Sequence, residues 1–192
     1  MFARRGFDAT SLAIIAAEVG VTKPSLLYHF PSKEELRAAV LEGLVGHWTE
    51  AIPRLLAAVS RGEDRFRAVT EEMIGFFERD PDRARLIVRE LLDRPKEMKT
   101  QLGKRVRPWV QMLGDSIRSG QRAGEIEPCV DPESYVMHTM TLVIAAIAAS
   151  DVLGELLRGE GGKREAKDRG RRELLRIAKS SLFSGSTTTV GS

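Results

Sequence analysis

Apolar residues along this chain recur every three to four positions, which is the spacing of helices that bury one face. No stretch alternates apolar and polar residues as a half-buried strand would, and no segment is repeated. Helices are predicted from about Lys33 into the forties, over about Glu63 to Glu78, from Pro81 through Leu92, from Lys96 to about Ala123, from Pro132 to about Leu153, and through Leu174 to Leu182. The pattern therefore predicts an all-α protein.

Proline, glycine and aspartate mark where these helices begin, bend and end. Pro53 is expected to interrupt the helix that begins near residue 33, because proline lacks the backbone N–H that an interior position needs. Pro108 is expected to bend the long basic helix before it stops near Gly124. Asp80 and Asp131 each precede a proline, and this order is typical of a capped helix start.

Residues 10–36 predict two short helices on a tight turn, followed by the start of a third. Thr10 can cap the first helix, and Gly20 can end it because glycine takes positive φ without strain. Thr22 can cap the second helix, and Pro24 fits its first turn, where a missing N–H costs nothing. This is the layout of a helix-turn-helix unit that reads DNA.

A recognition helix enters the major groove by its N-terminal end. The residues at that end, Lys23, Pro24 and Ser25, are therefore predicted to read base edges. Phosphates are held by hydroxyl groups, cations and helix N-termini. The predicted phosphate contacts are Thr10, Ser11, Thr22, Tyr28, His29 and Lys33.

The segment GFDATSLAIIAAEVGVTKPSLLYHFPSKEEL, residues 6–36, resembles the signature of the DNA-binding domain of the TetR family of bacterial transcriptional repressors. The resemblance implies a homodimer, a double-stranded DNA operator of approximate two-fold symmetry, and release of that DNA when a small-molecule effector enters the C-terminal domain. Two features depart from the family pattern. Leu27 stands where a tyrosine is common, and the first helix is represented only by its last turn, Phe2 to Gly6.

The resemblance and the helix pattern together predict three parts. Residues 1–47 form a helix-turn-helix DNA-binding domain with a truncated first helix, and residues 48–183 form a helical ligand-binding and dimerisation bundle. Within the bundle, residues 154–170 are expected to be a charged connection or a frayed helix start. Residues 184–192 are expected to be a disordered tail, because they are rich in Ser, Thr and Gly.

Aromatic residues and methionines on different helices of the bundle could converge on an apolar ligand site. The predicted ligand-binding residues are Trp48, Met73, Phe77, Trp109, Met112 and His138. Phe76, Met137 and Met140 are further candidates, and His47 is a second histidine that could orient a ligand. The alternative for each of these side chains is that it simply fills the core.

The predicted helix over residues 132–153 is rich in alanine, which permits close helix packing. Together with the last helix, and as the family resemblance implies, it is predicted to meet its two-fold mate in a four-helix dimer interface. The predicted interface residues are Ile144, Ala145, Ala148, Leu174 and Ile177. The alternative is an ordinary helix buried inside one subunit.

The net charge of the chain is weak evidence for DNA binding. The chain carries a formal net charge of +3, yet residues 1–47 contain five Lys or Arg and five Asp or Glu. The basic excess lies in residues 94–122 and 158–179, so the total does not itself indicate nucleic-acid binding. The positions of Lys23 and of the capped helix ends favour DNA binding.

Other chemistry is not apparent in the sequence. One cysteine, Cys129, allows no intrachain disulfide, and no signal peptide or bilayer-spanning apolar run is recognisable, so a soluble cytoplasmic protein without a membrane partner is expected. The three histidines lack metal-ligand spacing, and no phosphate-binding glycine loop or nucleophile motif occurs. We therefore expect no metal, no cofactor and no enzymatic activity.

The sequence thus predicts a ligand-responsive DNA-binding transcriptional regulator, and in particular a repressor. An effector that favours the arrangement unable to bind DNA would move the helix that begins near Lys33 and so change the separation of the recognition helices. Two alternatives from other classes stay open. One is a helical ligand-binding protein with a decayed DNA reader, and the other is an all-α enzyme that uses His47 or His138.

Overall fold

The computed structural model describes residues 1–59, 62–157 and 162–183, and in these ranges it contains helices and no strands. The helices are α1 (Phe2–Arg5), α2 (Leu12–Glu18), α3 (Lys23–His29), α4 (Lys33–Ala58), α5 (Gly62–Arg79), α6 (Pro81–Asp93), α7 (Pro95–Arg105), α8 (Arg107–Arg122), α9 (Pro132–Ala148), α10 (Ser150–Leu156) and α11 (Gly162–Ser180). The predicted all-α fold is confirmed. The tail that was expected to be disordered, residues 184–192, lies outside the described ranges.

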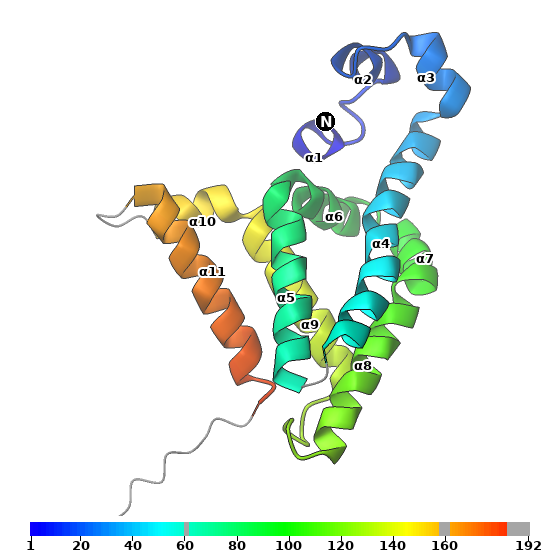
Figure 1. Ribbon diagram of the computed structural model, residues 1–192. Coiled ribbons are helices and arrows are strands. Elements are labelled where there is room, and N and C mark those ends of the chain that lie inside the picture. Colours follow the sequence, from blue (N-terminus) through cyan, green and yellow to red (C-terminus); the bar gives the residue numbers. More distant parts are fainter. Residues whose placement is uncertain (60–61, 158–161, 184–192) are drawn as a thin grey trace, which may run out of the picture.

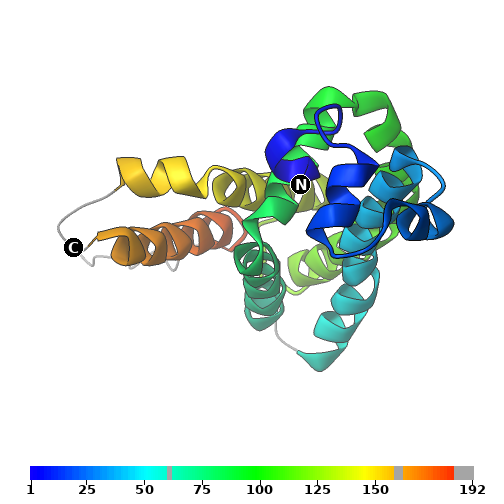
Figure 2. The ribbon, with the colours of Figure 1, turned by 90° about the horizontal axis from the view of Figure 1, so that it is seen from above.

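Helices α1 to α3 form a small unit at one end of the molecule, which we call the reader (Figure 1). Helix α4 starts at this unit and continues beside α7 and α8, so one helix joins the reader to the remaining helices, the bundle. Helix α6 packs against both α1 and α9. Seen from above, α10 and α11 lie side by side and extend away from the rest of the bundle (Figure 2).

Helix α4 is longer than its sequence pattern predicts. The expected interruption at Pro53 is wrong, because α4 continues through this residue to Ala58. Pro53 is exposed, whereas Ala51 and Ile52 beside it are buried in the bundle core. Their packing offsets the backbone hydrogen bond that proline removes. Helix α4 also crosses the predicted domain boundary after residue 47 without a break.

Two other predicted helices are divided. The helix expected over residues 96–123 is α7 and α8, which meet at Val106, and Pro108 occupies the first turn of α8. Proline is tolerated there because the first turn has no hydrogen bond to lose, so Pro108 starts a helix and does not bend one. The helix expected over residues 132–153 is α9 and α10, which are bent by 73°.

The last predicted helix begins earlier than expected. Much of the connection expected over residues 154–170 is helical, because α10 reaches Leu156 and α11 begins at Gly162. Residues 158–161 of that connection lie outside the described ranges. Within those ranges no single helix is long and apolar enough to cross a membrane, whereas the bent pair α9 and α10 could do so by length and composition.

Short polar residues cap the helices at most of the predicted positions. Thr22, Asp80 and Asp131 each accept a hydrogen bond from a backbone N–H in the following turn, so these predicted caps are confirmed. The predicted cap at Thr10 is wrong. Ser11 caps α2 instead, because the Thr10 side chain is buried and bonds to a carbonyl of the preceding turn.

One apolar cluster holds the reader to the bundle. It combines buried side chains of the reader with others from α4, α6 and α7: Phe2, Ala3, Ile15, Ala16, Leu26, Leu36, Leu41, Leu86 and Met98. A larger cluster fills the bundle itself. Because the smaller cluster draws on both parts, the reader has no apolar core that is separate from α6 and α7.

A buried ion pair lies at the same junction. The guanidinium of Arg37, in the second turn of α4, donates to the carboxylates of Glu90 in α6 and Glu97 in α7. The side chains of Arg37 and Glu90 expose only 10% and 4% of their surface. Two charges removed from water in this way depend on each other, so the pair fixes α6 to the reader end of α4.

Replacing Glu90 with Gln keeps the shape of the side chain and removes the charge opposite Arg37. We expect the free energy of unfolding to fall by about 3 kcal/mol, because an uncompensated buried charge costs about this much. Glu97→Gln is the matched control, since the Glu97 side chain is 49% exposed and its loss should cost less than about 1 kcal/mol. Urea unfolding followed by circular dichroism measures both variants, and equal losses would contradict this prediction.

Candidate nucleic-acid interface and ligand cavity

Helix α3 presents an open N-terminal end. Thr22 caps this end by accepting a hydrogen bond from the Ser25 N–H at 3.2 Å, and Leu26 packs α3 into the apolar cluster of the reader. Lys23, Pro24 and Ser25 are exposed. The residues predicted to read bases therefore lie together on a helix end that is held in place and accessible from outside.

Four of the six predicted phosphate contacts lie on the surface of the reader. Ser11 is exposed and its hydroxyl caps α2, while Thr22 is exposed at the start of α3. Tyr28 is 84% exposed, and its ring meets that of His29 edge to face, with the centroids 5.2 Å apart. These hydroxyl, imidazole and helix-end groups are of the kinds that contact a DNA backbone.

Of the other two predicted phosphate contacts, the structure contradicts Thr10 and gives Lys33 a partner inside the protein. Thr10 exposes none of its surface, and its hydroxyl donates to the Gly6 carbonyl oxygen at 2.7 Å. The Lys33 ammonium donates to the Phe7 carbonyl oxygen at 2.9 Å and lies 4.1 Å from the centroid of the Phe7 ring. The Thr10 hydroxyl is therefore unavailable to a phosphate. The Lys33 ammonium is half-buried and has three N–H donors, so its phosphate contact stays a prediction.

Phe7 is a residue whose role sequence reasoning missed. Besides Lys33, the guanidinium groups of Arg37 and Arg94 lie 5.5 and 4.3 Å from the centroid of its ring. Cations near an aromatic face are attracted to its negative potential. Phe7 thus joins the reader to α4 and to the end of α6. No local pattern could have shown this, because its partners lie far along the chain.

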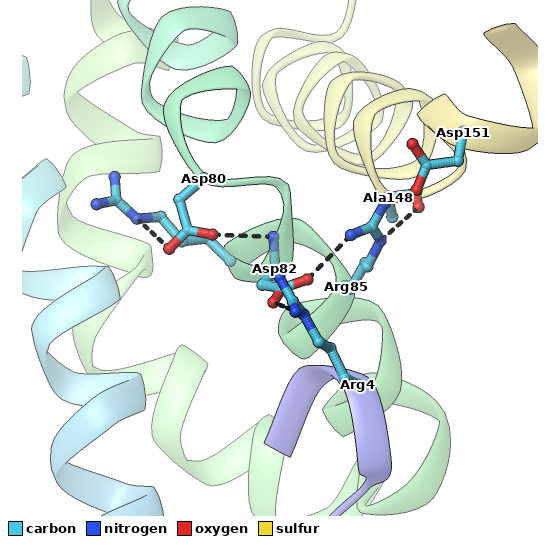
Figure 3. Close-up of polar contacts among 7 residues, drawn as sticks. Arg4, Asp80, Asp82, Arg85, Ala148 and Asp151 are labelled. Carbon is cyan, nitrogen blue, oxygen red and sulfur yellow. Dashed lines mark hydrogen bonds and ion pairs between the residues drawn. The ribbon is translucent and has the colours of Figure 1, made fainter. Parts of the chain in front are cut away.

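The start of α6 carries a second connection to the reader (Figure 3). Arg4 of α1 donates to Asp82 at 2.6 Å, and Arg85 donates to the same carboxylate at 2.9 Å. Arg85 also donates to the Ala148 carbonyl oxygen at 3.3 Å and to Asp151 at 2.5 Å. Burial would raise the pKa of Asp82, but the hydrogen bonds from Arg85 and Arg4 outweigh it, and the pKa is lowered. This chain of contacts runs from the reader through α6 to the bend between α9 and α10.

A cavity of about 430 Å³ lies in the bundle, between α4, α5, α6, α8 and α9. Cavities of this size hold small molecules. Of the predicted ligand-binding residues, Trp48, Met73, Phe77 and Trp109 line it. The further candidates Met137 and Met140 line it as well: sequence reasoning found these side chains but could not show that they meet.

Met112 and His138 are corrected, because both are exposed and neither lines the cavity. Trp109 and Leu113 are the residues of α8 near Met112 that line the cavity, and Met140 lines it on α9. The helical repeat then turns Met112 and His138 away from the cavity.

Phe76 and His47 lie beside the cavity but do not line it. Their rings stack with centroids 4.4 Å apart, and His47 Nε2 lies 3.4 Å from a carboxylate oxygen of Glu72. These contacts join α4 to α5. Within the described ranges, no three His, Cys, Asp or Glu side chains are grouped as a metal ion would require.

Helix α6 has a cavity face that residue type alone did not reveal. Ile87, Val88 and Leu91 line the cavity. Leu86 belongs to the apolar cluster of the reader, and Glu90 pairs with Arg37 of α4. A single short helix therefore separates the cavity from the reader.

The predicted dimer residues fall into two groups. Ile144 and Leu174 are corrected, because both are buried in the core of their own subunit. Ala145 lines the cavity, while Ala148 is half-buried and Ile177 is exposed. Larger apolar side chains are exposed on and beside α10 and on α11: Val152, Leu153, Leu156, Leu157 and Ile177.

Comparisons with known proteins agree with this geometry. The family model of bacterial regulatory proteins of the tetR family matches residues 1–40, and that of the tetracyclin repressor-like C-terminal domain matches residues 63–177. The transcriptional activator FasR of Mycolicibacterium smegmatis is 37% identical over 87 residues, which are 45% of this chain and 40% of FasR. The transcriptional regulator RutR of Escherichia coli is 29% identical over 138 residues, which are 70% of this chain and 63% of RutR.

Solved structures share the fold. The ketosteroid transcriptional regulator KstR2 of Mycobacterium tuberculosis superposes with a TM-score of 0.72 at 19% identity, over 96% of this chain and 90% of KstR2. A TetR/AcrR family regulator from Thermobifida fusca gives a TM-score of 0.61 at 25% identity, over 91% and 90% of the two chains. Because the two family models cover the reader and most of the bundle, the chain belongs to the TetR family of bacterial regulatory proteins.

Proposed function

We propose that this chain is a ligand-responsive transcriptional repressor, which binds a near-palindromic DNA operator as a homodimer and leaves it when a small-molecule effector fills the cavity. The observation that carries the proposal is the open end of α3, where Lys23, Pro24 and Ser25 are exposed on a firmly packed helix. Family membership supports it, as do the names of FasR and RutR, which are both transcriptional regulators.

In this proposal the two kinds of contact have different tasks. Lys23 donates to a guanine edge in the major groove, and Pro24 and Ser25 complete the surface that faces the bases. Ser11, Thr22, Tyr28 and His29 hold phosphates and so fix the orientation of α3 on the duplex. Thr10 supports the reader from inside and contacts no DNA.

The homodimer of this proposal is supported by the surface of α10 and α11. Val152, Leu156 and Ile177 expose apolar area that a second copy can cover, in an isologous contact. Two readers related by a two-fold axis then meet half-sites about one helical turn of DNA, ~34 Å, apart. A shift of a few ångströms in one reader is enough to lose a half-site.

The effector acts through α6. It would occupy the cavity against Ile87 and Val88. Other residues of α6 contact the reader, through Leu86 and Asp82, and the start of α4, through Glu90. An effector that prefers a displaced α6 shifts the population toward a reader arrangement that does not fit the operator.

A DNA-binding unit of this kind can serve repression or activation, and FasR is named an activator. Repression is the simpler outcome, because a dimer that occupies a promoter excludes polymerase without a further contact. We place this action in the cytoplasm, with no cofactor and no membrane partner.

Fluorescence anisotropy at fixed, near-physiological salt tests the proposal. The chain is titrated against labelled DNA from its own promoter region, with scrambled duplex as competitor. We expect specific binding with a pair of protomers on each site. Absence of sequence preference on any genomic DNA would overturn the proposal in favour of a helical ligand-binding protein with a decayed reader.

Lys23→Ala should weaken operator binding by ~1 to 3 kcal/mol and relax the preference at one base pair, because the lysine is proposed to read a guanine. Lys99→Ala is the control, since Lys99 is exposed on α7, outside the reader, and should leave operator affinity unchanged. Competition with operators altered one base pair at a time measures the preference. Equal loss on every sequence would make Lys23 a phosphate contact.

Leu156→Lys should convert the dimer to a monomer, because it places a charge in the proposed apolar contact of α10. Leu92→Lys on α6 is matched to it, since both leucines are 76% exposed, and it should leave the dimer intact. Sedimentation velocity at micromolar concentration distinguishes the two states. A dimeric Leu156→Lys variant would place the interface on another surface.

A further inference from the structure

The wall of the cavity carries almost no charge. Arg65 is the one charged residue among those described on the wall. Trp48, Phe77 and Trp109, with aliphatic side chains of α4, α6, α8 and α9, supply most of the rest. A charged ligand group placed against this surface would lose its hydration and gain no partner in return.

The arginine does not change this conclusion. Arg65 already donates through Nε to the carbonyl oxygen of Val59. The carboxylate of Glu125 lies against Gly62, so close that a Cβ at Gly62 would come within 2.5 Å of it. Gly62 and Arg65 belong to the same end of the cavity wall. The Glu125 carboxylate near this end of the wall disfavours an anion there.

Two of the hydroxyl groups on the wall are already engaged. Tyr135 donates to the Ala178 carbonyl oxygen at 2.6 Å, and Thr141 donates to the Met137 carbonyl oxygen at 2.8 Å. Burial raises the pKa of Tyr135 to about 12, so its phenol stays neutral at physiological pH. Neither group needs a ligand to complete its hydrogen bonding.

Thr70 differs from these residues. It lies on α5, lines the cavity and exposes only 3% of its surface. Thr10, Thr100 and Thr141 each donate to the carbonyl oxygen four residues earlier. For Thr70, no such bond is found among the described residues. On the described part of this wall, the buried polar atom without a partner is a different one, Nε1 of Trp109. The Thr70 hydroxyl is therefore a group on the cavity wall that a ligand oxygen could bond without displacing a protein partner.

From the cavity wall and the Thr70 hydroxyl, we infer that the effector is an uncharged, mainly apolar molecule that carries one oxygen in hydrogen-bond contact with Thr70. The inference rests on the proposed function, since it takes the cavity as the effector site. Alcohols, ketones and aldehydes on a hydrocarbon chain or ring belong to this class. Carboxylates, phosphorylated compounds and quaternary amines do not.

The chain carries its own probe for this test. It contains two tryptophans, Trp48 and Trp109, and both line the cavity. Their fluorescence should therefore report occupancy without DNA. A matched probe set has one phenylpentyl skeleton with four ends: 5-phenylpentan-1-ol, 5-phenylpentanoate, protonated 5-phenylpentylamine and pentylbenzene.

We expect saturable changes in tryptophan fluorescence with the alcohol, and at least a tenfold weaker affinity for the carboxylate and for the ammonium at neutral pH. Binding of either ion as tightly as the alcohol would overturn the inference. So would failure of the alcohol to bind saturably. Neither result would bear on the proposed DNA binding, because the anisotropy titration with DNA tests that function separately.

Thr70→Val tests the hydroxyl itself, because valine keeps the shape of threonine. We expect it to weaken binding of the alcohol about three- to tenfold and to leave pentylbenzene unchanged. Thr141→Val is the matched control, since Thr141 also lines the cavity but already bonds to a backbone oxygen, and it should change neither affinity. Equal effects of Thr70→Val on both probes, or no effect on either, would overturn the role of Thr70.

Ser116→Ala gives a second control. Ser116 is a half-buried wall residue on α8, and its loss should leave the affinity for the alcohol unchanged. If Ser116→Ala weakened the alcohol and Thr70→Val did not, the ligand oxygen would belong at Ser116 and the assignment to Thr70 would be wrong.

Discussion

The buried ion pair between Arg37 and Glu90 constrains the rest of the structure. Neither charge can stay in the interior without the other, so α4 and α6 cannot separate there without a large energetic cost. At the opposite end of α6, Asp82 pairs with Arg4 of the reader. Helix α6 is thus attached to the reader at its start and to the first turns of α4 near its end. Three of its residues line the cavity: Ile87, Val88 and Leu91. What happens in the cavity is therefore one helix away from the DNA-binding surface.

This arrangement explains how a small apolar ligand could act on DNA that it never touches. The ligand needs only to favour one of two positions of α6, and the ion pairs transfer that preference to the start of α4 and to α1. Because a dimer must place two readers at a fixed spacing, a small change in each subunit has a large effect on operator binding. In the proposed mechanism, the mainly apolar cavity selects the ligand, and the charged junction transmits its binding to the reader.

Local signals predicted the parts of the structure that local chemistry decides. The caps at Thr22 and Asp131 and the open end of α3 follow from neighbouring residues alone. The predicted interruption at Pro53 is wrong because packing of α4 into the bundle core, which no local pattern shows, decides whether the helix continues. The bond from Lys33 to Phe7 could not be predicted from a local pattern, because the two residues lie 26 positions apart. In the cavity, residue type found the aromatic wall, but only the fold shows which face of each helix turns inward.

Hydrogen exchange of the backbone amides tests the role of α6 most directly, with and without 5-phenylpentan-1-ol in the wild type and in Glu90→Gln. Protection should change in α5 and α8 at the cavity wall, and also in α6 and in the first turns of α4, residues 33–41. In Glu90→Gln the change at the wall should persist and the change in α4 should disappear. A response confined to the cavity wall in the wild type, with residues 33–41 of α4 unchanged, would contradict transmission through α6.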